Sequence, residues 1–400
     1  MGGSVAPSAA PTLAALRERI DEVDRRLVEL LNARSELVVE VGKVKRATGT
    51  PIYAPHREAE VLARVLSMND GPLPGRTIEG IYRELMSGSF ALEKPLTIGF
   101  LGPKGSFSHM AAVKHFGSSV GFEDLREIAG VFTEVQRGHV DYGLVPIENS
   151  IMGGIVETLD AFAKRAMPGD GGSGAGASRP APRGVKSGPQ GIHICAEVQL
   201  EVHHALLGAC EPSKIRRIAS KPEVFSQCRV WLATQYPQAE LVPVASSSRA
   251  VQMVREAAER GTLEQEGLAA IGSQLAAELY DVSVLFDGIE DDPNNITRFF
   301  VLGRHEAGRT GHDKTSIMFS TLNKPGALVR VLTDFQEAGV NLTHIDKRPS
   351  GRNNWSYTFF IDAEGHQSDA PVAAAINKAR RHCRELIVLG SYPRSQRILG

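Results

Sequence analysis

One long heptad pattern near the N-terminus constrains the fold of this chain more than any other feature. Between Thr12 and Arg46, leucine, isoleucine and valine occupy two adjacent heptad lines: Leu13, Ile20, Leu27 and Val41, and Leu16, Val23, Leu30, Leu37 and Val44. Proline is absent from this stretch, and Gly42 is its one glycine. The spacing predicts a single long amphipathic helix. Such a helix has too few partners in its own section to cover the apolar seam, which favours pairing with a second copy.

The rest of the chain divides into sections with different periodicities. Helices expected at about 56–68 and 76–92 complete an all-α section over residues 11–94. The apolar runs LTIGFLG, DYGLVPI, GLAAIGS and RFFVLG alternate with helical stretches, which predicts an α/β domain over residues 95–304. Within it, residues 168–190 are rich in Gly, Ser, Pro and Ala and predict a disordered insertion. Residues 313–393 follow the order βαββαβ, typical of an α+β ferredoxin-like unit.

Composition narrows the functional classes. The 45 Lys and Arg residues nearly balance the 46 Asp and Glu residues, so no global basic field favours nucleic acid or a membrane surface. No apolar run approaches the ~18 residues that span a bilayer. The four cysteines are far apart, so we expect neither a disulfide framework nor a metal site. We therefore expect a cytoplasmic protein that needs no cofactor.

Cations interrupt the apolar seam of the long helix. Arg34 stands on a heptad line, Arg17 and Lys45 flank the seam, and Arg57 opens the next predicted helix beside Glu58. Any one of them can be a solvated charge, but together they suit a bound dicarboxylate. At about 1.5 Å per residue, Arg17 and Lys45 lie roughly 42 Å apart, too far to hold one small molecule. One of the two must therefore come from a second chain, which predicts a homodimer or a dimer of dimers.

The segment LAALRERIDEVDRRLVELLNARSELVVEVGKVK, followed by PIYAPHREAEVL, resembles the all-helical type of chorismate mutase over residues 12–94. The resemblance implies that chorismate is bound by Arg34, Lys45, Arg57, Glu58, Ser89 and Glu93, with Arg17 from the partner subunit. Because the reaction is an intramolecular rearrangement, cations and hydrogen-bond donors suffice, and Lys45 and Glu93 are the expected catalytic residues. Ala54 stands where this family commonly has Asp.

Glu93 stands where this family commonly has Gln. A carboxyl group can donate a hydrogen bond to the ether oxygen of chorismate only when it is protonated. The sequence therefore predicts a mutase activity that falls as pH rises and that Glu93→Gln restores.

Several short polar motifs of the α/β section lie next to predicted strands. Each alone is ordinary turn chemistry, but GPKGSFSHMAA, VPIENS, SSSRA, AAIGSQLAAELYDV and TRF together resemble prephenate dehydratase in order and spacing. The resemblance implies two lobes like those of periplasmic binding proteins, with prephenate in the cleft. It assigns catalysis to Thr297, a carboxylate contact to Arg298, and the cleft lining to Ser106, Glu148, Asn149, Ser150, Ser247 and Phe299. We expect Thr297 to hydrogen-bond the departing hydroxyl group, and we give Lys221 no catalytic role.

The C-terminal section resembles an ACT regulatory domain. TLNKPGALVRVLTDFQEAGVNLTHIDKRP and WSYTFFIDAEGH carry the likeness, with Asp346 and Lys347 where many members have Glu and Ser. The resemblance implies a phenylalanine site between paired domains, formed by Gly326, Ala327, Leu328 and Val329 and by Ile345, Asp346, Lys347, Arg348 and Pro349. A helix beginning at Gly326 could also offer free N–H groups to a carboxylate.

The three sections together predict an enzyme that makes prephenate from chorismate, converts prephenate to phenylpyruvate, and is inhibited by phenylalanine. Two rivals remain open at this stage. One is a prephenate or arogenate dehydratase whose helical section only dimerises, which Ala54 allows. The other is a non-enzymatic amino-acid sensor.

Overall fold

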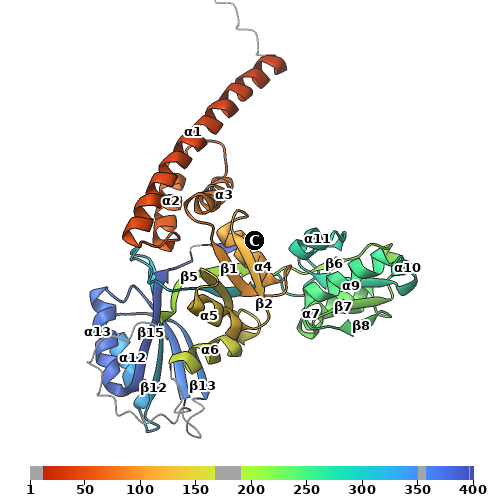
Figure 1. The fold of residues 1–400 in the computed structure, drawn as a ribbon. Coiled ribbons are helices and arrows are strands. Elements are labelled where there is room, and N and C mark those ends of the chain that lie inside the picture. Colours follow the sequence, from red (N-terminus) through yellow and green to blue (C-terminus); the bar gives the residue numbers. More distant parts are fainter. Residues whose placement is uncertain (1–11, 167–190, 350–356, 396) are drawn as a thin grey trace, which may run out of the picture.

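The computed structural model describes residues 12–166, 191–349, 357–395 and 397–400, which form three sections in chain order (Figure 1). The predicted disordered insertion at 168–190 therefore lies outside the described residues. The N-terminal section is helical throughout, as predicted. Its helices are α1 (Leu13–Thr48), α2 (Pro55–Ser67) and α3 (Gly75–Glu93).

The long helix α1 begins and ends on clear local signals. The Thr12 hydroxyl accepts a hydrogen bond from the Ala15 N–H, and Gly49 ends the helix with a φ of 69°. Gly42 is its one buried residue, since Glu93 of α3 packs directly against it. A Cβ at this position would lie 3.0 Å from the Glu93 side chain. The N-terminal half of α1 projects away from the rest of the molecule (Figure 1), and most of its apolar seam is exposed.

Most of the α/β section forms a first lobe around one mixed sheet. Strands run in the order β16-β5-β11-β3-β1-β2, and β4 pairs with β3. The elements of this lobe are β1 (Thr97–Leu101), α4 (Phe107–Phe116), β2 (Gly121–Leu125), α5 (Ile128–Arg137), β3 (Tyr142–Asn149), β4 (Gly153–Gly154), α6 (Val156–Ala166), β5 (His193–Glu201), β11 (Ile296–Gly303) and the C-terminal β16 (Ile398–Leu399). The core of the sheet is apolar on both faces, as expected when helices or another domain cover each face.

A second lobe is inserted between β5 and β11. Its sheet has the order β10-β6-β9-β7-β8. Its elements are β6 (Ala205–Leu207), η2 (Pro212–Lys214), β7 (Arg217–Ser220), α7 (Pro222–Gln227), α8 (Arg229–Gln235), β8 (Glu240–Pro243), α9 (Ser247–Glu259), α10 (Leu263–Glu266), β9 (Leu268–Gly272), α11 (Gln274–Tyr280) and β10 (Val284–Phe286). The chain therefore crosses between the lobes twice, which confirms the predicted two-lobed, periplasmic-binding-protein-like architecture.

A tight turn of the first lobe contacts the second. Gly105 has a φ of 78°, and a Cβ there would lie 3.0 Å from both Ala276 and the Ser248 hydroxyl. Ser273 Oγ donates to the Gly105 carbonyl oxygen at 2.7 Å, and Tyr280 Oη donates to the Lys104 carbonyl oxygen at 3.1 Å. This turn needs glycine both for its conformation and for the close approach of the lobes.

The C-terminal section has the predicted βαββαβ order. It comprises β12 (Asp313–Thr321), α12 (Ala327–Glu337), β13 (Leu342–Pro349), β14 (Tyr357–Glu364), α13 (Ala370–Ala379), η3 (Arg380–His382) and β15 (Cys383–Pro393). Its sheet order is β13-β14-β12-β15. Figure 1 places α12 and α13 on the outer face of this sheet, away from the first lobe.

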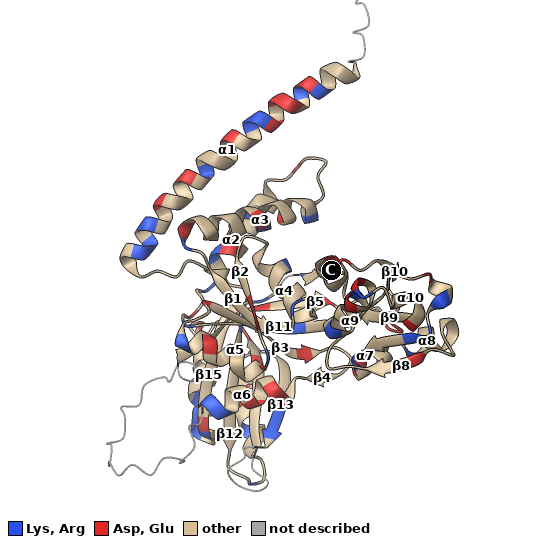
Figure 2. Cartoon of the chain, turned by 45° about the vertical axis from the view of Figure 1, so that its right-hand side comes forward, with Lys and Arg blue, Asp and Glu red and all other residues tan. Residues whose placement is uncertain are grey.

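Charge of both signs alternates along α1 and is spread over the other sections (Figure 2). On α1, Arg25 pairs with both Glu22 and Glu29 at 2.7 Å. Within the described ranges, none of the helices combines the length and the apolar character needed to cross a membrane.

Candidate functional sites

Four of the predicted mutase residues gather between α1 and α3. Arg34 Nη1 donates to Ser89 Oγ at 2.9 Å. Lys45 Nζ lies 2.9 Å from Glu93 Oε2 and donates to the Ile52 carbonyl oxygen at the same distance. The Glu93 side chain is buried, so its carboxylate and the Lys45 ammonium neutralise one another. This cluster has two cations and a hydroxyl that a ligand with two carboxylates could engage.

The other three predicted mutase residues lie elsewhere in the single chain. Arg17 is exposed on the projecting half of α1. Arg57 forms an exposed pair with Glu60 at 2.7 Å. Glu58 turns away to Arg83 of α3, at 3.3 Å. One chain therefore assembles only part of the predicted set.

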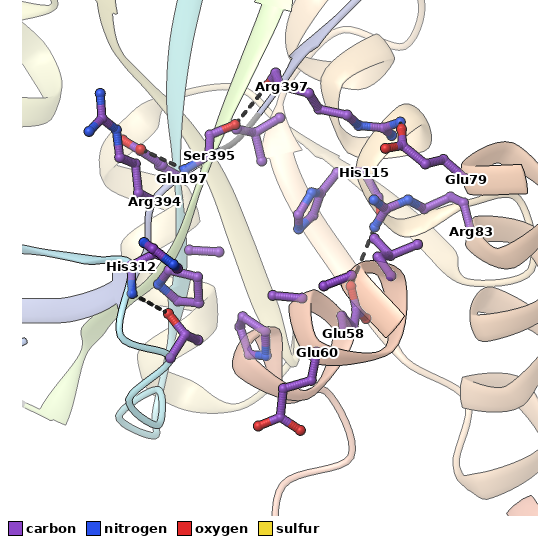
Figure 3. A pocket seen from close by; sticks show the side chains of 18 of the residues that line it. Glu58, Glu60, Glu79, Arg83, His115, Glu197, His312, Arg394, Ser395 and Arg397 are labelled. Atoms are coloured by element: carbon purple, nitrogen blue, oxygen red, sulfur yellow. Dashed lines mark hydrogen bonds and ion pairs between the residues drawn. The ribbon is translucent and has the colours of Figure 1, made fainter. Parts of the chain in front are cut away.

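Glu58 faces a pocket at the junction of the helical section, β5 and the segment after β15 (Figure 3). The pocket has a volume of about 380 Å³, and the Arg34–Ser89 and Lys45–Glu93 pairs do not line it. Burial raises the pKa of Glu58 to about 7, although Arg83 and Lys45 oppose the shift. Arg83 also donates to the His115 carbonyl oxygen at 2.8 Å. No sequence signal pointed to Arg83 or His115 at this position.

The predicted dehydratase residues Asn149 and Thr297 face each other across β3 and β11, at the point where the chain returns from the second lobe. Asn149 Nδ2 donates to Thr297 Oγ1 at 2.9 Å and to Asn295 Oδ1 at 2.7 Å. Asn149 Oδ1 accepts from the Ile151 and Met152 N–H groups at 3.1 and 3.0 Å. Because Thr297 Oγ1 accepts this bond, its own hydrogen is left to donate. Asn295 was missed, although NNITRF places it two residues before Thr297.

Strand alternation splits the two motifs between opposite faces, and together with burial it corrects three sequence-based assignments. Arg298 and Glu148 are paired in register on the face opposite Thr297 and Asn149. The Arg298 guanidinium is buried and contacts Glu197, Asp362 and Tyr392, so it is not placed to hold a substrate carboxylate. Glu148 turns toward the ACT section rather than the cleft. Phe299 is 1 % exposed within the apolar core and cannot line the cleft either.

The three predicted serines have distinct positions. Ser106 caps α4: its hydroxyl accepts from the His109 N–H at 3.2 Å and donates to the Leu101 carbonyl oxygen at 3.1 Å. Ser150 Oγ ties the hairpin to the segment before β11 through the Asn294 carbonyl oxygen at 3.0 Å. Ser247 is buried in the first turn of α9 in the second lobe. Among the described residues, no hydrogen bond joins Ser106 or Ser247 to Thr297.

A cavity of about 780 Å³ lies between the lobes, with Asn149 in its wall. The first lobe contributes Arg126 and Lys164, and the second contributes Lys221 and Glu223. The Lys221 and Glu223 side chains are partly exposed and 3.3 Å apart. Four cations and four carboxylates in all border this space, which is large enough for a small molecule, and the positions of Arg126 and Lys164 were not foreseen.

The predicted effector residues fall on two segments. Gly326 has a φ of 75° and caps α12, Ala327 is buried, Leu328 packs partly against the core, and Val329 is exposed. On β13, Ile345, Lys347 and Pro349 are exposed, whereas Asp346 and Arg348 face the dehydratase section. Across the described part of the chain, no hydrogen bond or ion pair joins the two segments. The predicted phenylalanine site lies between paired domains, so a second copy of the chain would be needed to bring the two segments together.

Comparison with known proteins agrees with this division of the chain. Family models match at residues 16–94 for chorismate mutase type II, 98–307 for prephenate dehydratase and 315–381 for the ACT domain. A bifunctional chorismate mutase/prephenate dehydratase of Stutzerimonas stutzeri is 40% identical over 395 residues, covering 97% of this chain and 99% of that protein.

Two solved structures resemble most of the chain. The Arthrobacter aurescens prephenate dehydratase in complex with L-Phe is 32% identical, with a TM-score of 0.61, and the match covers 75% of this chain and 90% of that one. A quorum-quenching acylase is 25% identical, with a TM-score of 0.62, and the match covers 75% of this chain and 98% of that one. The identity and coverage of the full-length relative, together with the three domain matches in order, show that this chain belongs to the bifunctional chorismate mutase/prephenate dehydratase family.

Proposed function

We propose that the chain rearranges chorismate to prephenate and then converts prephenate to phenylpyruvate. For the first reaction, Arg34 and Lys45 hold the carboxylates and the ether oxygen of chorismate in its compact conformer. Arg17 of a second chain completes the site, and Ser89 and Glu93 supply further hydrogen bonds. Since the rearrangement is intramolecular, orientation and stabilisation of the charge that develops on the ether oxygen are sufficient.

The second reaction is assigned to the Asn149–Thr297 pair, and this pair carries the proposal. The bond from the prephenate ring to its carboxylate breaks, and its electron pair enters the ring as carbon dioxide leaves. The ring carbon–oxygen bond breaks in turn, its electron pair goes to the departing oxygen, and that oxygen takes up a proton from solvent and leaves as water. Thr297 donates a hydrogen bond to that oxygen, because Asn149 already occupies Oγ1 as a donor and turns the hydroxyl hydrogen outward.

The likeness to an acylase shows that this fold alone does not determine the chemistry. Acyl transfer by a hydroxyl nucleophile needs a neighbouring base that accepts its proton. Thr297 Oγ1 instead receives a hydrogen bond from the Asn149 amide nitrogen, which cannot accept a proton. This polarity favours hydrogen-bond donation to a leaving group over nucleophilic attack.

L-phenylalanine is the proposed inhibitor of the second reaction, and a homodimer or a dimer of dimers is the proposed assembly. The description of the Arthrobacter aurescens structure as an L-Phe complex supports the inhibitor. The exposed apolar side chains along α1, including Leu27, Leu30 and Leu37, support pairing through this helix.

One assay tests both reactions: purified chain is given chorismate, and prephenate and phenylpyruvate are followed with and without L-phenylalanine. We expect both products in turn and less phenylpyruvate with the amino acid. Thr297→Ala should accumulate prephenate, with turnover lower by about 10²-fold, while Thr297→Ser retains most activity. Undiminished phenylpyruvate formation by Thr297→Ala would remove this residue from the reaction.

The same assay separates the rivals. Turnover of prephenate but not of chorismate would leave a dehydratase with a helical dimerisation module. Turnover of neither, with phenylalanine still bound, would favour the amino-acid sensor. Arogenate offered in place of prephenate tests the choice between these two substrates.

A further inference from the structure

Alternate residues of β13 have opposite environments. His344, Asp346 and Arg348 are partly buried against the dehydratase section, whereas Ile345 and Lys347 are exposed, Ile345 at 54 %. Successive side chains of a strand point to opposite faces, so one short strand can serve two surfaces. The inward face of β13 therefore belongs to the contact with the first lobe.

Two of the inward residues contact the β3–β4 hairpin (residues 142–154) and helix α6, which follows it. Arg348 Nε lies 2.8 Å from Asp160 Oδ1 of α6, and its Nη2 lies 3.3 Å from Asp160 Oδ2, a two-point contact. A Cβ at Gly154 of β4 would overlap the Asp346 carboxylate, so the two segments are in close contact there.

The third inward residue, His344, contacts strand β3 of the same hairpin. His344 Nδ1 lies 3.4 Å from Glu148 Oε2, and Glu148 directly precedes Asn149. Arg298 Nη1 lies 3.7 Å from the same Glu148 oxygen, and Arg298 Nη2 lies 2.6 Å from Asp362 of β14. Glu148, next to Asn149, and Arg298, next to Thr297, are thus both in contact with the ACT section.

The hairpin geometry connects these contacts to the Thr297 hydroxyl. Asn149 Oδ1 is fixed by the backbone of the turn at 151 and 152, while its Nδ2 orients Thr297 Oγ1. A shift of the β3–β4 hairpin would therefore change the direction in which Thr297 donates. Displacement of a catalytic group by about 1 Å can cost about 10²-fold in rate.

We propose that His344, Asp346 and Arg348 are positioning residues of the dehydratase, which hold the β3–β4 hairpin and α6 so that Asn149 orients Thr297. This inference rests on the proposed dehydratase function. It reassigns Asp346 and Arg348 from ligand contact to the contact between domains, and leaves the outward face of β13 available to an effector or a second copy.

The charges around His344 support an ionic contact near neutral pH. Glu148 of β3 and Asp362 of β14 raise the pKa of His344, while burial and Arg298 of β11 oppose them. The hydrogen bond and charge of His344, with Arg298, hold the pKa of Glu148 below its ordinary value. The His344–Glu148 pair is therefore ionic until the pH rises above the pKa of His344, where His344 loses its proton.

The first test is a charge exchange between β13 and α6, measured on the full chain as prephenate turnover. Arg348→Asp and Asp160→Arg should each lower kcat by about tenfold and change KM by less than about twofold. The double variant should regain most of the lost kcat. Chorismate turnover in the same preparations should stay at the wild-type level, because the mutase residues lie in another section.

Three outcomes separate the inference from the function on which it rests. A wild-type chain that does not convert prephenate defeats the proposed function. A wild-type chain that converts it, together with a double variant no better than the product of its singles, defeats the positioning role. A loss confined to KM also defeats it, since Asp160 would then act through the cavity wall.

The second test uses His344 alone. Wild-type kcat should fall as pH rises through the raised pKa of His344, and His344→Lys, which keeps its cation, should abolish that fall. His344→Gln should be low at every pH, by about tenfold. His139→Gln is the matched control, because His139 is an exposed histidine paired with Glu134 on α5. A wild-type profile retained in His344→Lys would overturn the assignment.

Discussion

Helix α1 and the ACT section relate to the central domain in opposite ways. The ACT sheet is joined to the first lobe by a buried network in which Glu197 receives both Arg298, at 2.8 Å, and Lys314, at 3.1 Å. Long helix α1, in contrast, buries only Gly42 and leaves its apolar seam in solvent. The dehydratase half is therefore built within one chain, whereas the mutase half is left open.

This difference indicates where each site is completed. Buried ion pairs are costly unless every partner is present, so we infer that the contact between the ACT section and the first lobe is complete within one chain. The exposed apolar face of α1 is unfavourable in water and indicates that a partner surface covers it. The mutase half should thus depend on a second chain, and the dehydratase half should not depend on it for its reacting residues.

The largest effect should come from dividing the mutase site between two chains. Arg17→Ala and Lys45→Ala should each lower chorismate turnover by about 10³-fold, because each removes a cation from the substrate. Prephenate turnover should remain unchanged in both. Mixing the two variants under conditions that exchange subunits should restore about a quarter of wild-type mutase activity, since each mixed dimer regains one intact site.

A mixture of the two variants that stays inactive would contradict the view that the mutase site is shared between two chains. If both variants form dimers and exchange subunits, but their mixture stays inactive, then Arg17 and Lys45 do not meet in one site. A strong loss of prephenate turnover in either variant would also count against the independence of the two halves.

The next effect concerns the junction pocket, where the helical section does contact the central domain. A carboxyl group whose pKa is raised in the folded state from 4.5 to about 7 destabilises that state as pH rises through this range. Glu58→Gln should therefore shrink the difference in unfolding free energy between pH 5 and pH 8 by about 2 kcal/mol, measured by urea unfolding.

Glu60→Gln provides the matched control on the same helix. Glu60 is exposed, and its hydrogen bond with Arg57 lowers the pKa of its carboxyl, so its removal should not reduce the loss of stability toward pH 8. If Glu58→Gln leaves the pH difference at its wild-type size, then Glu58 is not buried in solution as it is in this structure.

The two halves also differ in how far the sequence could predict them. The three helices and the βαββαβ unit follow from local periodicity, and their bounds agree with the structure within a few residues. The resemblance to the helical chorismate mutases placed Arg34, Lys45, Ser89 and Glu93 in one site, and the structure brings them together as two contacting pairs. The resemblance placed Glu58 in the same site, but its side chain turns to Arg83 instead. Which surface Glu58 faces depends on the packing of three sections.

The dehydratase motifs show a different limit. The family resemblance placed Glu148 and Arg298 in the cleft, whereas the strand period of two divides them from Asn149 and Thr297. That part of the error could have been avoided from the sequence. The partners of Arg298 could not have been named, because Asp362 and Tyr392 belong to a domain that docks only in the folded chain.

The smallest expected effect concerns Glu93, whose carboxylate is 2.9 Å from the Lys45 ammonium. In the open mutase half this pair has to separate, or Glu93 has to be protonated, before the side chain can donate to the ether oxygen of chorismate. Glu93→Gln should therefore raise chorismate turnover by about fivefold and flatten its dependence on pH, because an amide donates at any pH.

Glu58 could make mutase activity depend on pH by itself, since the pKa of its carboxyl is about 7. Comparing Glu93→Gln with Glu58→Gln separates the two carboxyl groups. A profile flattened by Glu58→Gln alone would remove Glu93 from the reaction and would tie mutase activity to the junction pocket. The open half would then be controlled through its contact with the central domain at that pocket.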